Sequence, residues 1–428
     1  MSQYTEMLKL RAETLSPDDD GYEESLLEVA SLFRGFDEAL TAFLLSHGYG
    51  GDPADAQAKA QFLRERFRAA GIEPVPRGIR GWFTPNRTIS RKTAFQICFA
   101  FGLDAAGTNE FFRTVRFERG FDCHTVSEAV YYFCMRGGLP YARAQAILSR
   151  LPDTERRKAL PRGDVLYTGT IVAHIEAIRD EERLIRYIED NLEHFGYNNV
   201  TAIKFLQGLW ASIAGSNGLA AREGKLIDES RNAFHPDRRK RPVCDSRSRE
   251  VVEAEIRREE ELMRDDYVVS NGESSTWTIY TQILGLDRSL EERCAPTRSL
   301  APVLTRNVLL PLRAADCFPN RQTIDQMLRG ETGDHEPIRK LIIFLVFYTF
   351  WAKKLVESGS AFFTAGYSDA GRCLDTINKY LLDAGYPELY PGNPYDWIFL
   401  WALHDAHPLE AFRSYILELF IAKDSGSA

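Results

Sequence analysis

The chain has 428 residues, with 53 basic against 61 acidic side chains and a formal net charge of −8 at pH 7. Hydrophobic residues make up 44% of it and aromatic residues 12%, which is typical of globular proteins with two or three domains and a substantial core. The acidic balance excludes proteins that coat nucleic acids through overall positive charge. Nucleic-acid binding would have to come from a local basic patch.

The spacing of the cysteines and the length of the apolar runs indicate in which compartment the protein is found. Seven cysteines are scattered without a CxxC pair, a pattern typical of reduced and mostly buried thiols. The N-terminus MSQYTEMLKLRAETL lacks the apolar core of a signal peptide. The longest apolar run, Leu341 to Trp351, is too short to span a bilayer. We expect a soluble cytoplasmic protein with no membrane segment.

Helical periodicity dominates the chain. Residues 1–34 contain one or two amphipathic helices, and apolar residues recur at helical spacing from Phe36 to His47 and from Ala56 to Ala70. Strand-like alternation is scarce. We therefore predict an all-α fold of two lobes with these divisions: 1–34, 35–105, 106–222, a charged linker and helix at 223–273, and 274–428.

The stretch from Ile72 to Leu103 is unusually basic. Its only acid is Glu73, and it carries five basic residues: Arg77, Arg80, Arg87, Arg91 and Lys92. Gly71 can end the preceding helix, Pro76 can open a short helix through Trp82, and Ser90 can cap the next one. A short exposed helix between two turns, rich in arginine, suits the DNA major groove.

This stretch resembles the second half of the lambda-repressor/Cro-like helix-turn-helix of bacteria and their mobile elements. In that pattern a recognition helix ends in a turn with proline, and a serine-capped helix closes the domain. The expected places are filled by Ile79, Trp82, Pro85, Ser90, Ala94 and Ile97. The match covers roughly residues 35–105. The alternative interpretation is three short helices with an arginine-rich rim that binds protein.

The resemblance implies sequence-specific binding of double-stranded DNA. Contacts to base edges are then expected from Arg77, Arg80 and Thr84. Contacts to phosphates are expected from Asn86, Arg87, Arg91 and Lys92.

A second, degenerate copy of the pattern is predicted at roughly 317–403. It would comprise a capped helix from Thr323 to Leu328, a turn at Gly330 and a long apolar helix. Acids such as Asp325 and Glu336 offset its basic residues and would be repelled by phosphate. We therefore expect this copy to contact protein or to be purely structural.

An internal repeat is predicted from the segments Thr108–Phe121 and Thr376–Tyr390. The second segment has one extra residue, and a further insertion is expected at 352–371. The segments align at these pairs: Asn109 with Asn378, Phe117 with Tyr386, and Phe121 with Tyr390.

Motifs for catalysis are absent from the sequence, including phosphate-binding loops, nucleophile elbows and zinc-protease signatures. The best metal candidate combines His404, Asp405, His407 and Glu410, but Pro408 would break the helix that has to align them. The basic segment 235–249 is interpreted as a surface linker, with phosphate contact as the alternative. We expect no enzyme, no metal and no cofactor.

Two functions follow from these patterns. The first is a DNA-binding transcriptional regulator that uses the N-terminal helix-turn-helix-like module, with a homodimer or protein partner held by the C-terminal lobe. The second is a protein-binding adaptor or inhibitor in a phage-defence or counter-defence system. The acidic total and the length, large for a simple repressor, favour the second.

Overall fold

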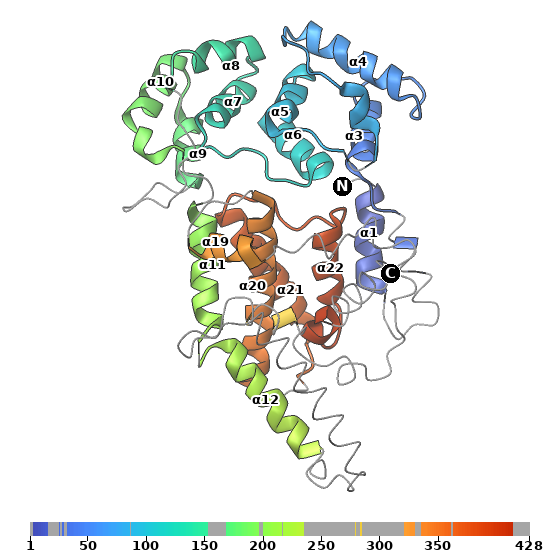
Figure 1. Cartoon of the computed structure of the whole chain (residues 1–428), viewed down its shortest axis with the longest axis vertical. Helices are drawn as coiled ribbons and strands as arrows, with labels where there is room; N and C mark the ends of the chain where they lie inside the picture. Colours follow the sequence, from blue (N-terminus) through green and yellow to red (C-terminus); the bar gives the residue numbers. More distant parts are fainter. Residues whose placement is uncertain are drawn as a thin grey trace, which may run out of the picture.

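The computed structural model describes residues 3–15, 25, 28–29, 32–85, 87–152, 168–196, 200–215, 217–234, 279, 283–284, 321–329, 335–360 and 363–413. Throughout these ranges the protein is helical and contains no strand, so the predicted all-α class is confirmed (Figure 1). The first half contains α1 (Gln3–Thr14), α3 (Phe36–Ser46), α4 (Ala56–Ala69), η1 (Ile79–Phe83), α5 (Arg91–Ala100), α6 (Ala105–Phe111), η2 (Phe112–Arg116), α7 (Val126–Arg136), α8 (Tyr141–Leu148), α9 (Thr168–Ala177), α10 (Glu181–Asp190) and η3 (Leu192–His194). The second half contains α11 (Val200–Ile213), α12 (Leu219–Phe234), α19 (Arg321–Leu328), α20 (His335–Ser358), α21 (Tyr367–Asp383) and α22 (Pro394–Ala402).

Buried apolar side chains form two separate clusters. The upper cluster joins residues from Ala39 to Phe195, and α5 lies at its centre with six consecutive buried residues, 94–99. A helical segment that is buried on all sides is apolar all round, and residues 94–99 have this pattern apart from Gln96. In Figure 1 this cluster is the upper group of helices, from α3 to α10.

The lower cluster surrounds α20, whose residues 341–348 are all buried. It also takes in the start of the chain, because α1 packs against α22 and the two are joined by tryptophan hydrogen bonds (Figure 1). Trp397 Nε1 donates to the carbonyl of Leu8 at 3.1 Å, and Trp401 Nε1 donates to that of Leu15 at 3.2 Å. The N-terminal helix is therefore part of the core formed by the C-terminal helices.

The predicted divisions of the chain need correction in two places. Residues 106–222 were expected to form one helical extension, but α11 packs on α20 in the lower cluster, whereas α7 to α10 belong to the upper cluster. The division between the cores falls between Phe195 and Val200. A single helix, α12, also crosses the expected boundary at 222/223. Polar composition alone suggested a linker there, but Glu223 is a buried partner of Tyr348, so this part of α12 faces the core.

Each cluster contains an arginine–carboxylate clamp. In the upper cluster, Arg91 at the start of α5 donates through Nε and Nη2 to the carboxylate of Glu128 in α7, at 3.0 and 2.8 Å. Glu128 also accepts from the backbone N–H of Asp122 at 2.6 Å, six residues earlier. In the lower cluster, Arg339 in α20 donates to Asp396 in α22 at 2.6 and 2.7 Å. Asp396 likewise accepts from a backbone N–H six residues earlier, that of Tyr390 at 2.9 Å.

The shared plan of the clamps supports the predicted repeat but changes its register. After α21, the left-handed position is Gly385 at φ 78°, and the corresponding left-handed residue after η2 is Phe117 at φ 55°. Phe117 therefore corresponds to Gly385, not to Tyr386. The extra residue lies in the first copy, because η2 is a π-helix, which accommodates one more residue than an α-helical turn. This local widening is not visible in the spacing of apolar residues.

The insertion expected at 352–371 lengthens helices and does not form one long loop. Residues 352–358 are the end of α20, and 367–371 are the beginning of α21. Helix α20 has 24 residues where α5 has 10, and four of the additional residues, 335–338, precede Arg339. The added turns of α20 carry Trp351 and Ala352 into the lower core.

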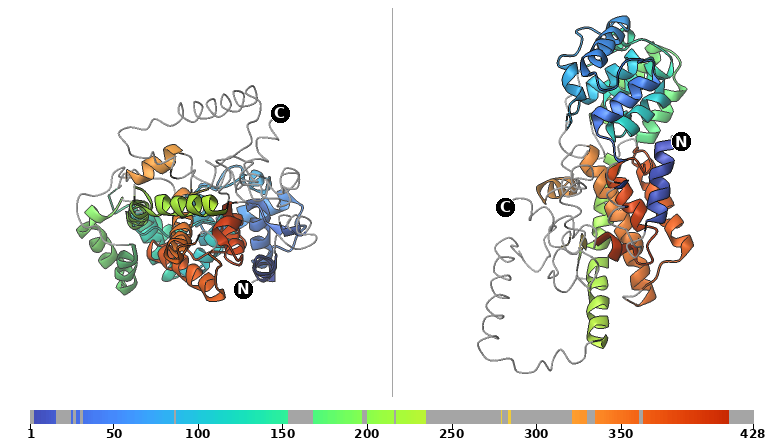
Figure 2. Two further views of the ribbon diagram at one scale, coloured as in Figure 1. Left: turned by 90° about the horizontal axis from the view of Figure 1, so that it is seen from below. Right: turned by 90° about the vertical axis from the view of Figure 1, so that its right-hand side faces the viewer.

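The two clusters meet through aromatic and arginine side chains. The Arg119 guanidinium lies 5.2 Å from the ring centre of Tyr386, and that of Arg113 lies 4.7 Å from the ring centre of Tyr390. Phe117 also stacks on Tyr390. The right-hand view of Figure 2 shows the upper helices lying above the lower ones. Arg119 is fully buried, so this junction is formed partly by buried charge.

Glu336, in the first turn of α20, gives this region a pH-dependent contribution to stability. Its Oε1 is buried and has no hydrogen-bond partner among the described residues. Burial raises the pKa of its carboxyl from 4.5 to about 7, against the attraction of Lys340 and Arg339. Because the folded state favours the protonated carboxyl, the stabilisation is complete below pH 4.5 and is lost as the pH rises to about 7. We expect it to be worth on the order of 2 kcal/mol.

The measurement is urea denaturation of the wild type and Glu336→Gln at several pH values between 4.5 and 7.5. The wild type should lose more unfolding free energy over this range than the variant, because a glutamine cannot ionise. Parallel pH profiles for the two proteins would contradict the assignment.

Among the described helices, none combines the length and the apolar character that a membrane span requires. The four described cysteines, Cys98, Cys123, Cys134 and Cys373, are buried free thiols, in keeping with the sequence expectation. The remaining three, Cys244, Cys294 and Cys317, lie outside the described residues.

Candidate nucleic-acid interface

The basic stretch begins with an irregular connection between α4 and η1. Gly71 ends α4 in a left-handed conformation at φ 67°, and the N–H of Ile72 donates to the carbonyl of Phe67 at 2.9 Å. The prolines at 74 and 76 lack the N–H that a continuing helix needs. Gly78, at φ 70°, then leads into η1. The helix expected from Pro76 through Trp82 is therefore a 3₁₀ helix that starts only at Ile79.

The short helix η1 is held by two apolar side chains. Ile79 is fully buried and Trp82 is 8% exposed, and the Trp82 ring meets Phe67 of α4 edge-on at 6.4 Å. Side chains three residues apart lie on the same side of a 3₁₀ helix, so Ile79 and Trp82 point into the core together. Arg80, between them in sequence, is exposed.

The predicted cap of the next helix is confirmed. The Ser90 hydroxyl accepts from the N–H of Thr93 at 3.2 Å, and α5 begins at Arg91. This start places Arg91 and Lys92 in the first turn, where their side chains diverge. Lys92 is exposed, whereas Arg91 is largely buried in the clamp to Glu128.

Four of the predicted contact residues present free positive charge. Arg77, Arg80, Arg87 and Lys92 are exposed, and no hydrogen bond or ion pair engages their charged groups within the described chain. Thr84, which follows η1, is exposed as well. Asn86 lies outside the described residues. We call Arg77, Arg80, Arg87 and Lys92 the basic surface.

Arg91 does not belong to this surface, and its predicted role as a phosphate contact is wrong. Besides Glu128, its guanidinium contacts Glu118 at 3.4 Å, the carbonyl of Arg119 at 2.9 Å and the carbonyl of Gly120. These partners occupy the donors that a phosphate would need. Glu118 and Glu128 lie 27 and 37 residues further along the chain, so the sequence around Arg91 does not predict these ion pairs.

The connection differs from that of the helix-turn-helix it resembles. Nine residues, 70–78, separate α4 from η1, whereas the two helices of that motif are joined by a turn of about three or four residues. Moreover, η1 has five residues and is not an α-helix. The residues of the basic surface therefore come from η1, from the loops on either side of it and from the first turn of α5. They do not lie on one long recognition helix.

In the second copy, the element that corresponds to η1 is α19, and it packs against another helix. In α19, Ile324 and Met327 are buried at the same three-residue spacing as Ile79 and Trp82. Here α19 packs against α11, and the side chain of Gln207 donates to the carbonyl of Leu328 at 2.9 Å. The predicted turn at Gly330 lies outside the described residues.

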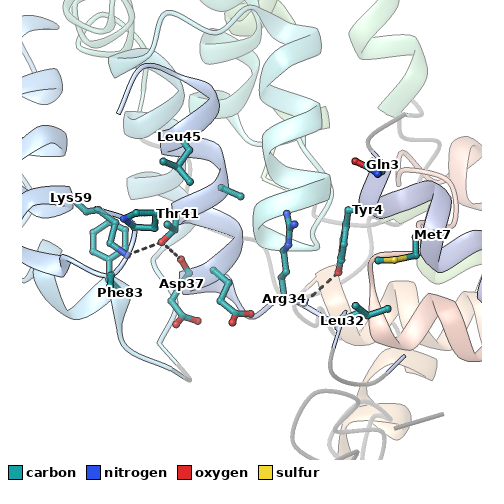
Figure 3. A pocket seen from close by; sticks show the side chains of 14 residues that line it. Gln3, Tyr4, Met7, Leu32, Arg34, Asp37, Thr41, Leu45, Lys59 and Phe83 are labelled. Atoms are coloured by element: carbon teal, nitrogen blue, oxygen red, sulfur yellow. Dashed lines mark hydrogen bonds between the residues drawn. The ribbon is translucent and has the colours of Figure 1, made fainter. Parts of the chain in front are cut away.

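A pocket of about 1070 Å³ lies between α1, α3 and the end of η1 (Figure 3). On one side Lys59, only 5% exposed, donates to the Thr41 hydroxyl at 2.9 Å and lies 4.4 Å from the ring centre of Phe83. Leu45, one turn beyond Thr41 on α3, is 43% exposed, and Met7 on the opposite side of the pocket is 37% exposed. This pocket combines exposed apolar side chains with a buried cation, and no sequence motif predicts it.

The metal candidate at the C-terminus is not assembled. Helix α22 ends at Ala402, so His404 and His407 lie in the bends that follow, and His407 Nδ1 is 3.0 Å from the carbonyl oxygen of Phe363. In the described part of the chain no three His, Cys, Asp or Glu residues are grouped so as to hold a metal ion.

No protein-family model, curated protein or solved structure matches the chain.

Proposed function

We propose that the protein binds double-stranded DNA through the basic surface and acts as a transcriptional regulator. The observation that supports this most is that Arg77, Arg80, Arg87 and Lys92 are all exposed and free of carboxylate partners. Arg91, by contrast, is neutralised by Glu118 and Glu128. A group of unneutralised cations is the electrostatic arrangement that phosphates require.

The wider charge distribution agrees with this proposal. Residues 56–103 carry nine basic side chains and two acids, Glu65 and Glu73, in a chain whose total is −8. A local positive field on a negative background orients a polyanion toward one face. If all four cations of the basic surface neutralised phosphates, log Kd would rise with log salt with a slope of about 3.6. The lower cluster would then hold a second copy of the chain or a protein partner, and the regulator would work in the cytoplasm.

We expect Arg77→Ala together with Arg80→Ala to abolish retention of DNA. Duplexes would first be selected from a genomic fragment library with the wild-type protein, and affinity then measured by fluorescence anisotropy. Each arginine contact is worth about 1–3 kcal/mol, so the double variant should bind at least tenfold more weakly. The control is Arg183→Ala in α10, an exposed arginine on the same cluster. Equal affinity of the double variant and the wild type would refute DNA binding by this surface.

A second function, protein binding as an adaptor, is favoured by the pocket in Figure 3. Exposed apolar side chains such as Met7 and Leu45, gathered around a pocket with Asp37 and Arg34 at its edge, suit a peptide with an apolar residue between polar ones. Capture of one stoichiometric protein, unaffected by nuclease and lost on Leu45→Asp, would support the adaptor. Capture that persists in Leu45→Asp would exclude this pocket.

A further inference from the structure

A second pocket, of about 520 Å³, lies beside the basic surface. Its walls come from three parts of the upper cluster. The loop before η1 contributes Arg77, the first turns of α5 contribute Lys92 and Gln96, and α8 contributes Tyr141 and Gln145. A volume of this size is within the range of small-molecule sites, which is about 300–1,000 Å³.

The outer end of this pocket suits an anion. Arg77 and Lys92 both line it, and neither is engaged by a carboxylate of the described chain. Ser90 and Thr93, whose hydroxyls are 2.9 Å apart, bring hydrogen-bonding groups to the amino end of α5. The amino end of a ten-residue helix adds a partial positive charge. One acid, Glu73, is also part of the lining and is exposed.

The inner wall presents a polar group that the protein leaves unsatisfied. Gln96 is 9% exposed, in the middle of the otherwise apolar run 94–99. Its Nε2 donates to the Tyr141 hydroxyl at 3.3 Å, but its side-chain carbonyl accepts no hydrogen bond from the described residues. This carbonyl oxygen lies in the lining of the pocket and is available to a ligand that donates a hydrogen bond.

We infer that this pocket binds a nucleotide. The phosphate would lie between Arg77 and Lys92 at the amino end of α5. The base would extend inward along Trp82, with its exocyclic amino group donating to the carbonyl of Gln96. An anion alone would leave the inner wall unused, and a neutral base alone would leave the two cations unused. A nucleotide with an amino-bearing base satisfies both ends.

A nucleotide bound in this pocket would also regulate DNA binding, a consequence that rests on the proposed function. Because Arg77 and Lys92 belong both to this pocket and to the basic surface, a bound nucleotide neutralises two of the four cations that would hold DNA. Nucleotide and DNA would therefore compete, and the nucleotide would act as an effector that releases the operator.

Binding is tested by isothermal titration calorimetry of the full chain with AMP, GMP, CMP and inorganic phosphate. We expect at least one nucleotide to bind with Kd below 1 mM and at least tenfold more tightly than phosphate. For AMP, the analogue without the 6-amino group, purine riboside 5′-monophosphate, should bind at least tenfold more weakly. No binding by any of the three nucleotides, or equal binding of nucleotide and phosphate, would overturn the inference.

Variants separate this inference from the proposed function. Lys92→Ala should weaken nucleotide binding at least tenfold. Gln96→Leu removes the acceptor in the inner wall, and Gln145→Ala removes an exposed side chain of the same wall, a change that should not disturb folding. Both should weaken nucleotide binding and leave DNA binding unchanged, whereas Arg80→Ala should do the reverse. Nucleotide binding that survives Lys92→Ala and Gln145→Ala would overturn the site, even if the DNA experiments succeed. Melting temperatures confirm that each variant is folded.

Discussion

Replacing Arg339 with methionine is expected to lower the unfolding free energy by about 4 kcal/mol, the middle of the range for breaking a buried ion pair. Arg339 is 2% exposed and Asp396 is fully buried, and two hydrogen bonds of 2.6 and 2.7 Å join them. The variant leaves the Asp396 carboxylate buried with the N–H of Tyr390 but without a counter-charge. The charge has no access to water, so the cost cannot be relieved without opening the lower cluster.

Urea denaturation followed by circular dichroism measures this effect. The control is Lys353→Ala, which removes an exposed ion pair with Glu357 on the same helix and should cost less than about 0.5 kcal/mol. The double variant Arg339→Met with Asp396→Leu should recover much of the loss, because it removes both charges. A loss below about 1 kcal/mol for Arg339→Met would show that the clamp does not hold the lower core together.

Replacing Arg91 with methionine is expected to cost about 3 kcal/mol of unfolding free energy while leaving the DNA affinity of the folded protein unchanged. The smaller figure reflects the greater exposure of this clamp, whose Arg91 and Glu128 side chains are 16% and 10% exposed. The methionine leaves Glu128 facing the loop at 119–122 with no cation. If Arg91 has a structural role, Arg91→Met should lower the stability of the protein. If Arg91 contacts phosphate, as the sequence suggested, the same variant should lower the affinity for DNA.

The matched control is the next residue, Lys92→Ala. Lys92 is exposed, so its removal should change the unfolding free energy by less than about 0.5 kcal/mol. It should nevertheless weaken DNA binding, with a smaller salt slope. If Arg91→Met weakened DNA binding at full stability, the assignment of Arg91 to the clamp would fail.

The neighbouring residues Arg91 and Lys92 show which features of the site can be predicted from the sequence and which cannot. Both are basic residues in the first turn of a helix whose cap, Ser90, is recognisable from sequence and present in the structure. Local pattern cannot separate them, because the difference is set by Glu118 and Glu128, which only the tertiary fold brings to Arg91. For the same reason the sequence does not predict the pocket near Gln96, although a glutamine between Phe95 and Ile97 interrupts an otherwise apolar run.

By itself the sequence determined the helical class, the bounds of α3 and α4 to within a residue or two, and the concentration of positive charge in residues 72–103. These features depend on spacing and composition within a few turns of chain. Only the tertiary structure decided that α1 joins the C-terminal core, that η2 widens into a π-helix, and which arginines keep their charge free for a ligand. Those outcomes depend on burial and on partners that lie tens or hundreds of residues away in the chain. The pattern of residues within a few helical turns predicts neither the burial nor the partners.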